Sequence, residues 1–238
     1  MEIIVFDIFG DYGHFRKYWT TTSPLTFSFI PPTALYGIIA AIIGIDKNEY
    51  LKIINYQTIK FSQRIINPIN KTRMGINLVN TKDNIKINKD GNWFIKDRTQ
   101  IRFEFLKNPH FRIYIQKIDE NTEKLETFLK ENKNFYTISL GLSELIAKVK
   151  YIGTFEASEN ITENEIDIHS IIPEEKIKYI KFEEGKKYIK ERVPLNITVE
   201  RKILSFKDII AEINADTIKC IPEKYIEVKE TGENIVFI

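Results

Sequence analysis

The feature that most constrains the fold is a charge-free stretch near the N-terminus that ends in a continuously apolar segment. No charged residue occurs between positions 18 and 45, and residues 34–45 are apolar throughout. Pro31 and Pro32 precede this segment, and proline is tolerated in the first turn of a helix, where amide donors lack partners. We expect a helix over about 33–43 that ends at Gly44. Because this helix is apolar on all sides, other elements must pack around it.

A membrane span is an alternative interpretation, since a spanning helix needs about 20 mostly apolar residues. Hydroxyl residues open the stretch at 20–23 and the two prolines interrupt it, so a buried helix fits better. Residues 1–10 carry no basic segment and are typical of a strand, not of a signal peptide. Hydrophobic residues make up 43% and charged residues 29% of the chain, as in globular proteins. The single cysteine, Cys220, excludes an internal disulfide framework and predicts a reduced, cytoplasmic setting.

The remaining elements follow a definite order along the chain. Short apolar or alternating runs predict strands at 3–9, 56–66, 98–106, 111–118 and 149–155. A short helix is expected at 46–54, and another at 122–131 with Thr122 as its cap. The order β-α-β-(arm)-β-α-β is the split βαβ, or ferredoxin-like, plan of an α+β fold.

We predict two regions in the chain. The first covers 1–157 and contains an inserted β-hairpin arm at about 67–108, in which Asp90 and Gly91 form a typical hairpin turn. A polar segment at 156–165 leads to a small β-rich C-terminal region over 158–238. Within that region we expect one helical patch near 206–213.

Charge divides the chain into a basic and an acidic half. Residues 1–118 carry a net charge of +8 and residues 119–238 a net charge of −6, so the overall +2 conceals the division. The arm and its flanks, 60–108, carry +7. Such asymmetry favours nucleic-acid contact on the basic half, although a solvated lysine-rich face is the alternative. The acidic half either keeps the protein soluble or faces a basic subunit.

The loop after the first strand combines aromatic, cationic and hydroxyl side chains. Aromatic rings stack on nucleic-acid bases, at about 1–3 kcal/mol per base, and cations and hydroxyls contact phosphate and sugar. This combination is typical of single-stranded RNA recognition. For Phe15, Phe27 and Phe29 we favour packing beneath the loop. The candidate RNA-binding residues of the loop are His14, Arg16, Lys17, Tyr18, Trp19, Thr22 and Ser23.

The arm and its flanks supply a second group of candidates. Met74 stands beside Arg73 and either wedges between bases or packs at the base of the arm. The candidate RNA-binding residues of this group are Arg64, Lys71, Arg73, Met74, Arg98 and Arg102. Further lysines of the arm are Lys82, Lys86, Lys89 and Lys96.

Most enzyme motifs are missing from the sequence. It contains no phosphate-binding glycine loop, no HExxH and no GxSxG, and its three histidines lie far apart. We therefore expect no metal ion and no cofactor. Lys107 and His110 flank an Asn-Pro pair and are candidates for acid–base cleavage of RNA, since imidazole titrates near neutrality. The alternative, which we favour, is a turn with an exposed histidine.

Three segments resemble a known family. The N-terminal strand with residues 10–44 (GDYGHFRKYWTTTSPLTFSFIPPTALYGIIAAIIG) resembles the start of the CRISPR-associated Cas-five family of the RAMP superfamily. Residues 98–115 and 135–153 are similar to the same family. The resemblance implies an RRM-like palm with a β-hairpin thumb, here the arm. It also implies that the 16–23 loop and the Arg73–Met74 region face RNA.

The resemblance further implies a role in antiviral defence. Such subunits bind the 5′ handle of the crRNA in type I Cascade complexes, here of the I-B kind, beside the Cas-seven backbone subunit and the large subunit. Target DNA is contacted indirectly, and no membrane is involved. One branch of the family is instead a metal-independent endoribonuclease that processes pre-crRNA with a Tyr, a Lys and a His. Lys107 and His110 are not adjacent and no Tyr matches, so we expect a non-catalytic subunit, with the endoribonuclease as the alternative.

Overall fold

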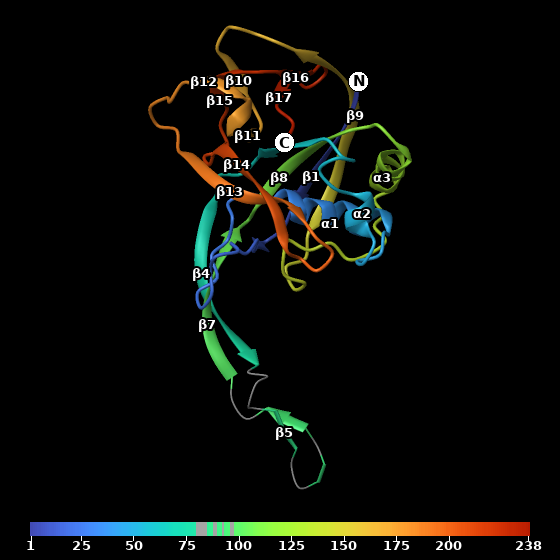
Figure 1. Cartoon of the computed structure of the whole chain (residues 1–238), viewed down its shortest axis with the longest axis vertical. Helices are drawn as coiled ribbons and strands as arrows, with labels where there is room; N and C mark the ends of the chain where they lie inside the picture. The colour runs from blue at the N-terminus through green and yellow to red at the C-terminus, as the bar shows by residue number, and fades with distance from the viewer. Residues whose placement is uncertain (80–84, 88–89, 92, 96–97) are drawn as a thin grey trace.

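The computed structural model describes residues 1–79, 85–87, 90–91, 93–95 and 98–238. Figure 1 shows a body of sheets and helices from which one long β-hairpin projects. Three candidate lysines of the arm, Lys82, Lys89 and Lys96, lie outside the described residues, as does the side chain of Lys86.

A six-stranded sheet forms the centre of the body, in the order β17-β16-β9-β1-β8-β3. All of its neighbouring strands are antiparallel. Its strands are β1 (Glu2–Phe9), β3 (Phe61–Ile65), β8 (His110–Gln116), β9 (Lys148–Asn160), β16 (Tyr225–Val228) and β17 (Glu233–Ile235). Along the sequence, helices follow β1 and β8 whereas the arm lies between β3 and β8, and the described chain is a mixed fold composed mostly of sheet.

Helix α1 (Pro32–Ile43) is the buried helix that the sequence predicts. Pro31 precedes it, and Gly44 ends it with φ of 81°, a conformation that glycine adopts without strain. It packs with α3 (Glu120–Lys130) against the side of the sheet formed by Phe6 and its neighbours. The expected cap of α3 is wrong by three residues. Asp119 is the N-cap, because its carboxylate accepts from the Thr122 backbone amide, and Thr122 completes the capping box.

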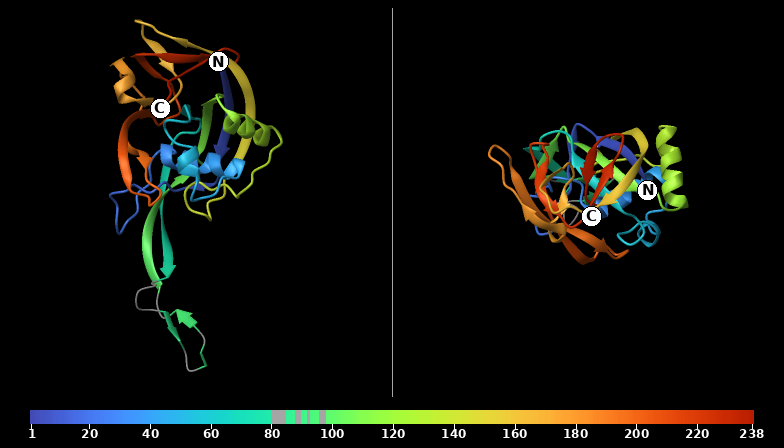
Figure 2. Two further views of the ribbon diagram at one scale, coloured as in Figure 1. Left: turned by 45° about the vertical axis from the view of Figure 1, so that its right-hand side comes forward. Right: turned by 90° about the horizontal axis from the view of Figure 1, so that it is seen from above.

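The opposite face of the sheet has its own apolar cluster. Alternate residues of β1, Ile3 and Val5, pack there with Tyr114 of β8 and with β16 and β17 from the C-terminal end of the chain. The sheet therefore carries apolar side chains on both faces, and residues of its own strands β16 and β17 pack on one of them. Figure 2 shows these two strands, in red, at the end of the body away from the hairpin.

The predicted arm begins as a regular antiparallel hairpin of β4 (Asn70–Val79) and β7 (Arg98–Lys107). The short strand β2 (Tyr12–Gly13) extends its base by pairing with β7. Further out, β5 (Ile85–Ile87) pairs with β6 (Trp93–Ile95), and Gly91 between them has φ of 81°, as the Asp-Gly pair predicts.

The C-terminal half adds two three-stranded sheets. One has the order β10-β15-β12, from β10 (Ile166–Ile168), β15 (Ile218–Pro222) and β12 (Ile177–Ile180). The other has the order β11-β14-β13, from β11 (Ile172–Pro173), β14 (Ile203–Glu212) and β13 (Tyr188–Ile197). A short 3-10 helix, η1, covers Glu174–Lys176.

Some predicted boundaries and one predicted element differ from the structure. The expected helical patch near 206–213 is wrong, since β14 occupies it and pairs with both β11 and β13. A short apolar run in a sequence fits either a helix or a strand. Here the pairing of β14 with its two neighbours makes the segment a strand. The boundary expected at 157/158 falls within β9, and α2 covers only Tyr50–Ile53. Within the described part of the chain, no helix has the length and apolar character that crossing a membrane requires.

Candidate nucleic-acid interface

The loop of residues 14–30 lies between the base of the β4–β7 hairpin and strand β13 (Figure 1). The backbone amide of Glu104 on β7 donates to Pro24 O at 2.9 Å. Lys71 Nζ on β4 donates to Thr26 O at 3.0 Å. These bonds fix the loop against the base of the hairpin.

The outer part of the loop exposes the residue types that bind RNA. Tyr18 and Trp19 are 43% and 51% exposed, and their ring centroids lie 4.6 Å apart in an edge-to-face contact. Arg16 is exposed and donates to the carbonyl oxygens of Thr20 at 2.8 Å and Thr21 at 3.2 Å, which braces the tip. The expected contacts Thr22 and Ser23 are exposed beside them.

Lys17 has a different environment from Arg16. Its Nζ lies 2.7 Å from Glu191 Oε1 of β13, and only 16% of the side chain is exposed. The same carboxylate accepts from the backbone amide of Ser28 at 2.8 Å. Lys17 therefore joins the loop to the C-terminal half of the chain, and its charge is compensated within the protein.

His14 lies beneath the loop and is only 2% exposed. Its Nδ1 donates to the carbonyl oxygen of Glu104 at 2.7 Å, and its ring contacts Phe103 and Phe105. Burial lowers the pKa of His14, an effect that the bond to Glu104 opposes only in part. The neutral imidazole therefore packs against β7 beneath the loop and does not reach the exposed surface.

The register of the β4–β7 hairpin places three candidate arginines on one face. Arg73 stands opposite Glu104, Gly75 opposite Arg102, and Val79 opposite Arg98. Because side chains alternate along a strand, Arg73, Arg98 and Arg102 share that face, and all three are exposed. Met74 lies on the other face, opposite Phe103, and is half-buried.

Arg64 lies apart from the loop, on β3 of the central sheet. It forms an ion pair with Glu233 of β17, and Arg112 Nη1 lies 3.3 Å from the same carboxylate. His110 belongs to the same network, since its Nε2 lies 3.0 Å from Asp7 Oδ2. The structure therefore does not bring Arg64 together with the other candidates.

Lys107 and His110 flank a tight turn between β7 and β8. Asn108 in that turn has φ of 48°, and its backbone amide donates to Asp11 O at 2.8 Å. Lys107 is exposed, whereas His110 is half-buried. The predicted turn is confirmed, but the expected exposure of its histidine is wrong, because His110 packs against the sheet and contacts Asp7.

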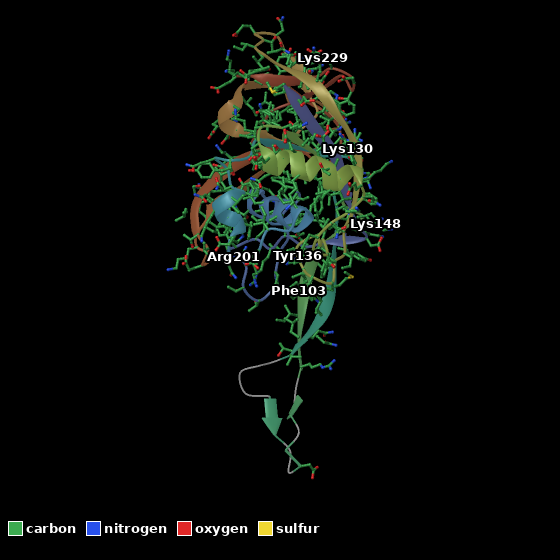
Figure 3. The ribbon with its side chains drawn as sticks, turned by 90° about the vertical axis from the view of Figure 1, so that its right-hand side faces the viewer. Phe103, Lys130, Tyr136, Lys148, Arg201 and Lys229 are labelled. Carbon is green, nitrogen blue, oxygen red and sulfur yellow. The ribbon has the colours of Figure 1, made fainter. Side chains whose placement is uncertain are left out.

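A cavity of about 850 Å³ opens where the loop, one side of α1 with the residues that follow it, the segment 136–142 and the turn after β13 meet. Its lining includes the exposed cations Arg16, Lys47 and Arg201 and the aromatic side chains of Tyr50 and Tyr136. Arg201 Nη1 donates to the Tyr50 hydroxyl at 2.6 Å. Phe103, Tyr136 and Arg201 lie near the junction of body and hairpin in Figure 3.

Most residues of this cavity were not predicted from the sequence. Lys47, Tyr50, Tyr136 and Arg201 carry no local motif, and only folding brings them next to Arg16. Among the described residues that line the cavity, Asp46 supplies the one carboxylate, so the charge there is mainly positive.

The fold is that of CRISPR-associated proteins. A "CRISPR RNA-guided surveillance complex" chain is 11% identical with a TM-score of 0.51, covering 91% of each chain. "Crystal structure of a CRISPR protein from Archaeoglobus fulgidus" describes another, 17% identical with a TM-score of 0.52, covering 99% of this chain and 98% of that one. No curated protein matches the sequence.

The family follows from the sequence itself. The profile described as "CRISPR-associated protein (Cas_Cas5)" matches residues 3–208. This chain belongs to that CRISPR-associated Cas5 family, as the resemblance of its N-terminal segments predicts.

Proposed function

We propose that this chain is a subunit of a type I Cascade complex that binds the 5′ handle of the crRNA. The observation that carries the proposal is the exposure of Arg16, Tyr18 and Trp19 beside a hairpin whose one face carries three exposed arginines. Rings that stack on bases and cations that contact phosphates are the two components of single-strand RNA binding. Membership of the Cas5 family supports the same role.

Within this proposal, the four strands β9-β1-β8-β3 with α1 and α3 are an RRM-like palm, and the β4–β7 hairpin is its thumb. The thumb crosses the guide next to a Cas-seven backbone subunit, with its arginine face toward the RNA. The chain also helps to seat the large subunit, so it meets target DNA indirectly. The I-B subtype stays a prediction.

The cavity beside the loop is the proposed place for a nucleotide of the handle. The exposed cations Arg16 and Arg201 of its lining suit a phosphate, and the exposed ring of Tyr136 offers apolar surface to a base. Its volume of about 850 Å³ lies within the usual range for small-ligand pockets, roughly 300–1,000 Å³.

The direct test is binding of handle RNA by the Arg16→Ala/Trp19→Ala double variant at fixed salt. Lys17 is left unchanged, because it holds the loop to Glu191. Loss of one stacking ring and one phosphate contact should weaken binding by about 100-fold. A matched control is Lys229→Ala/Phe182→Leu, which removes an exposed cation and an exposed ring elsewhere. Equal affinity of the double variant and the wild type would reject the proposal.

A further inference from the structure

The aromatic surface of the loop continues onto the C-terminal half of the chain. The Tyr18 ring centroid lies 4.6 Å from that of Trp19 and 4.9 Å from that of Phe206 on β14. Beyond Phe206, the Arg192 guanidinium of β13 lies 5.2 Å from the ring centroid of Phe206. Three rings and one guanidinium thus form a row, Trp19–Tyr18–Phe206–Arg192, across two parts of the chain that are far apart in sequence.

The row faces outward. Tyr18, Trp19 and Arg192 are exposed and Phe206 is half-buried, so each offers surface to a ligand. Lys17 Nζ lies 5.5 Å from the Trp19 ring centroid, so the surface that the row offers is the part of Trp19 and Tyr18 that stays exposed together with Arg192. A guanidinium over a ring adds both a charge and a flat surface for stacking.

The two halves of the row are held in a fixed relation by Glu191. This carboxylate, 7% exposed on β13, binds Lys17 Nζ at 2.7 Å and the Ser28 amide at 2.8 Å on the two sides of the loop. Glu191 directly precedes Arg192, so the strand that fixes the loop also presents the cation at the end of the row. The platform therefore exists before any ligand binds, which reduces the ordering cost of binding.

We propose that Trp19, Tyr18, Phe206 and Arg192 form a stacking platform for consecutive bases of single-stranded RNA, half of it supplied by the acidic C-terminal part of the chain. The inference rests on the proposed RNA-binding function and adds the residues Phe206 and Arg192 to it. Stacking tolerates any base, so the platform adds affinity without reading sequence.

The test compares Phe206→Leu and Arg192→Ala with the wild type in binding of two probes, handle RNA and a short oligouridine. Each variant should weaken both probes by about tenfold, the loss of roughly one stacked base. Phe206→Tyr keeps the aromatic ring and should bind both probes as tightly as the wild type. This result distinguishes a loss of stacking from a packing defect. Matched controls are Phe182→Leu, an exposed ring packed on Tyr188, and Lys190→Ala, a cation on the same strand as Arg192.

The outcomes separate this inference from the function on which it rests. If oligouridine binds with an affinity that depends on Phe206 and Arg192, and handle RNA binds no more tightly than oligouridine, the platform is supported and specific binding of the handle is rejected. If handle RNA binds tightly but neither Phe206→Leu nor Arg192→Ala weakens it beyond the controls, the platform is overturned and handle binding stands. If neither RNA binds, both are overturned.

Discussion

Arg112 Nε lies 2.9 Å from Asp7 Oδ1, and this ion pair joins the neighbouring strands β8 and β1 in the centre of the sheet. Asp7 is 4% exposed and also lies 3.0 Å from His110 Nε2. The hydrogen bond to Asp7 raises the pKa of Arg112 above its ordinary value despite partial burial, so the guanidinium stays charged. The pair lies on the face of the sheet that β17 covers with Glu233.

Replacing Asp7 tests how much that pair contributes to stability. Asp7→Asn leaves a partly buried guanidinium with a weaker partner, and we expect the free energy of unfolding to fall by about 2–3 kcal/mol, somewhat below the usual cost of breaking a fully buried pair. Urea denaturation at neutral pH measures it. Asp11→Asn, on the exposed turn that follows β1, is the control and should change stability by less than about 0.5 kcal/mol. Equal stability of both variants would contradict the role given to the pair.

Glu126 on α3 predicts a pH dependence of stability. Burial by itself raises the pKa of Glu126, but bonds from Lys130, Thr154 and Lys117 outweigh it and lower that pKa to about 2. Because the folded-state pKa lies below the unfolded value, this contribution is complete above about pH 5 and is lost as the pH falls toward 2.

The variant Glu126→Gln isolates that contribution. At pH 7 we expect it to be less stable than the wild type by about 2 kcal/mol, allowing for solvent around the lysines. The difference should shrink steadily between pH 5 and pH 2 in urea denaturation. If the difference in unfolding free energy between variant and wild type stays constant from pH 5 to pH 2, the charge of Glu126 does not contribute to stability.

The arginine face of the hairpin predicts a change in salt dependence. Replacing Arg73, Arg98 and Arg102 by alanine removes three proposed phosphate contacts. The slope of log affinity for handle RNA against log salt should therefore become shallower by about 2. A triple alanine variant of Lys133, Lys224 and Lys229, which lie on other elements, should keep the wild-type slope. Equal slopes for the wild type and both triple variants would show that the arginine face of the hairpin does not contact the RNA.

Incubation of the purified protein with repeat RNA in EDTA distinguishes the binding subunit from a metal-independent endoribonuclease. We expect intact RNA, because His110 is engaged with Asp7 and Lys107 stands on the other side of a turn. Defined cleavage at the handle boundary that Lys107→Ala or His110→Ala abolishes would establish the enzymatic alternative.

The local elements were predictable because their signals are local. The apolar run behind Pro31 and Pro32 could be stable only as a buried helix, and alternation at Ile101, Phe103 and Phe105 required a strand. The pairing of strands that are far apart in the sequence was not predictable in the same way. Residues 206–212 became part of β14 because β11 and β13 lie on either side of it.

The same distinction between local and long-range signals applies to the candidate site. The exposure of Arg16, Tyr18 and Trp19 agrees with their expected role, since a loop rich in rings and hydroxyls presents some of them outward. The pairing of Lys17 with Glu191 could not be read from the sequence, because the two residues are 174 positions apart. Phe206 and Arg201 were missed for the same reason.

The most direct test of the central claim is photo-crosslinking of handle RNA that carries 4-thiouridine, followed by mass spectrometry of the attached peptides. We predict crosslinks in the 16–23 loop and on the arginine face of the β4–β7 hairpin. Crosslinks confined to the β10-β15-β12 sheet, or spread evenly over the surface, would contradict the claim.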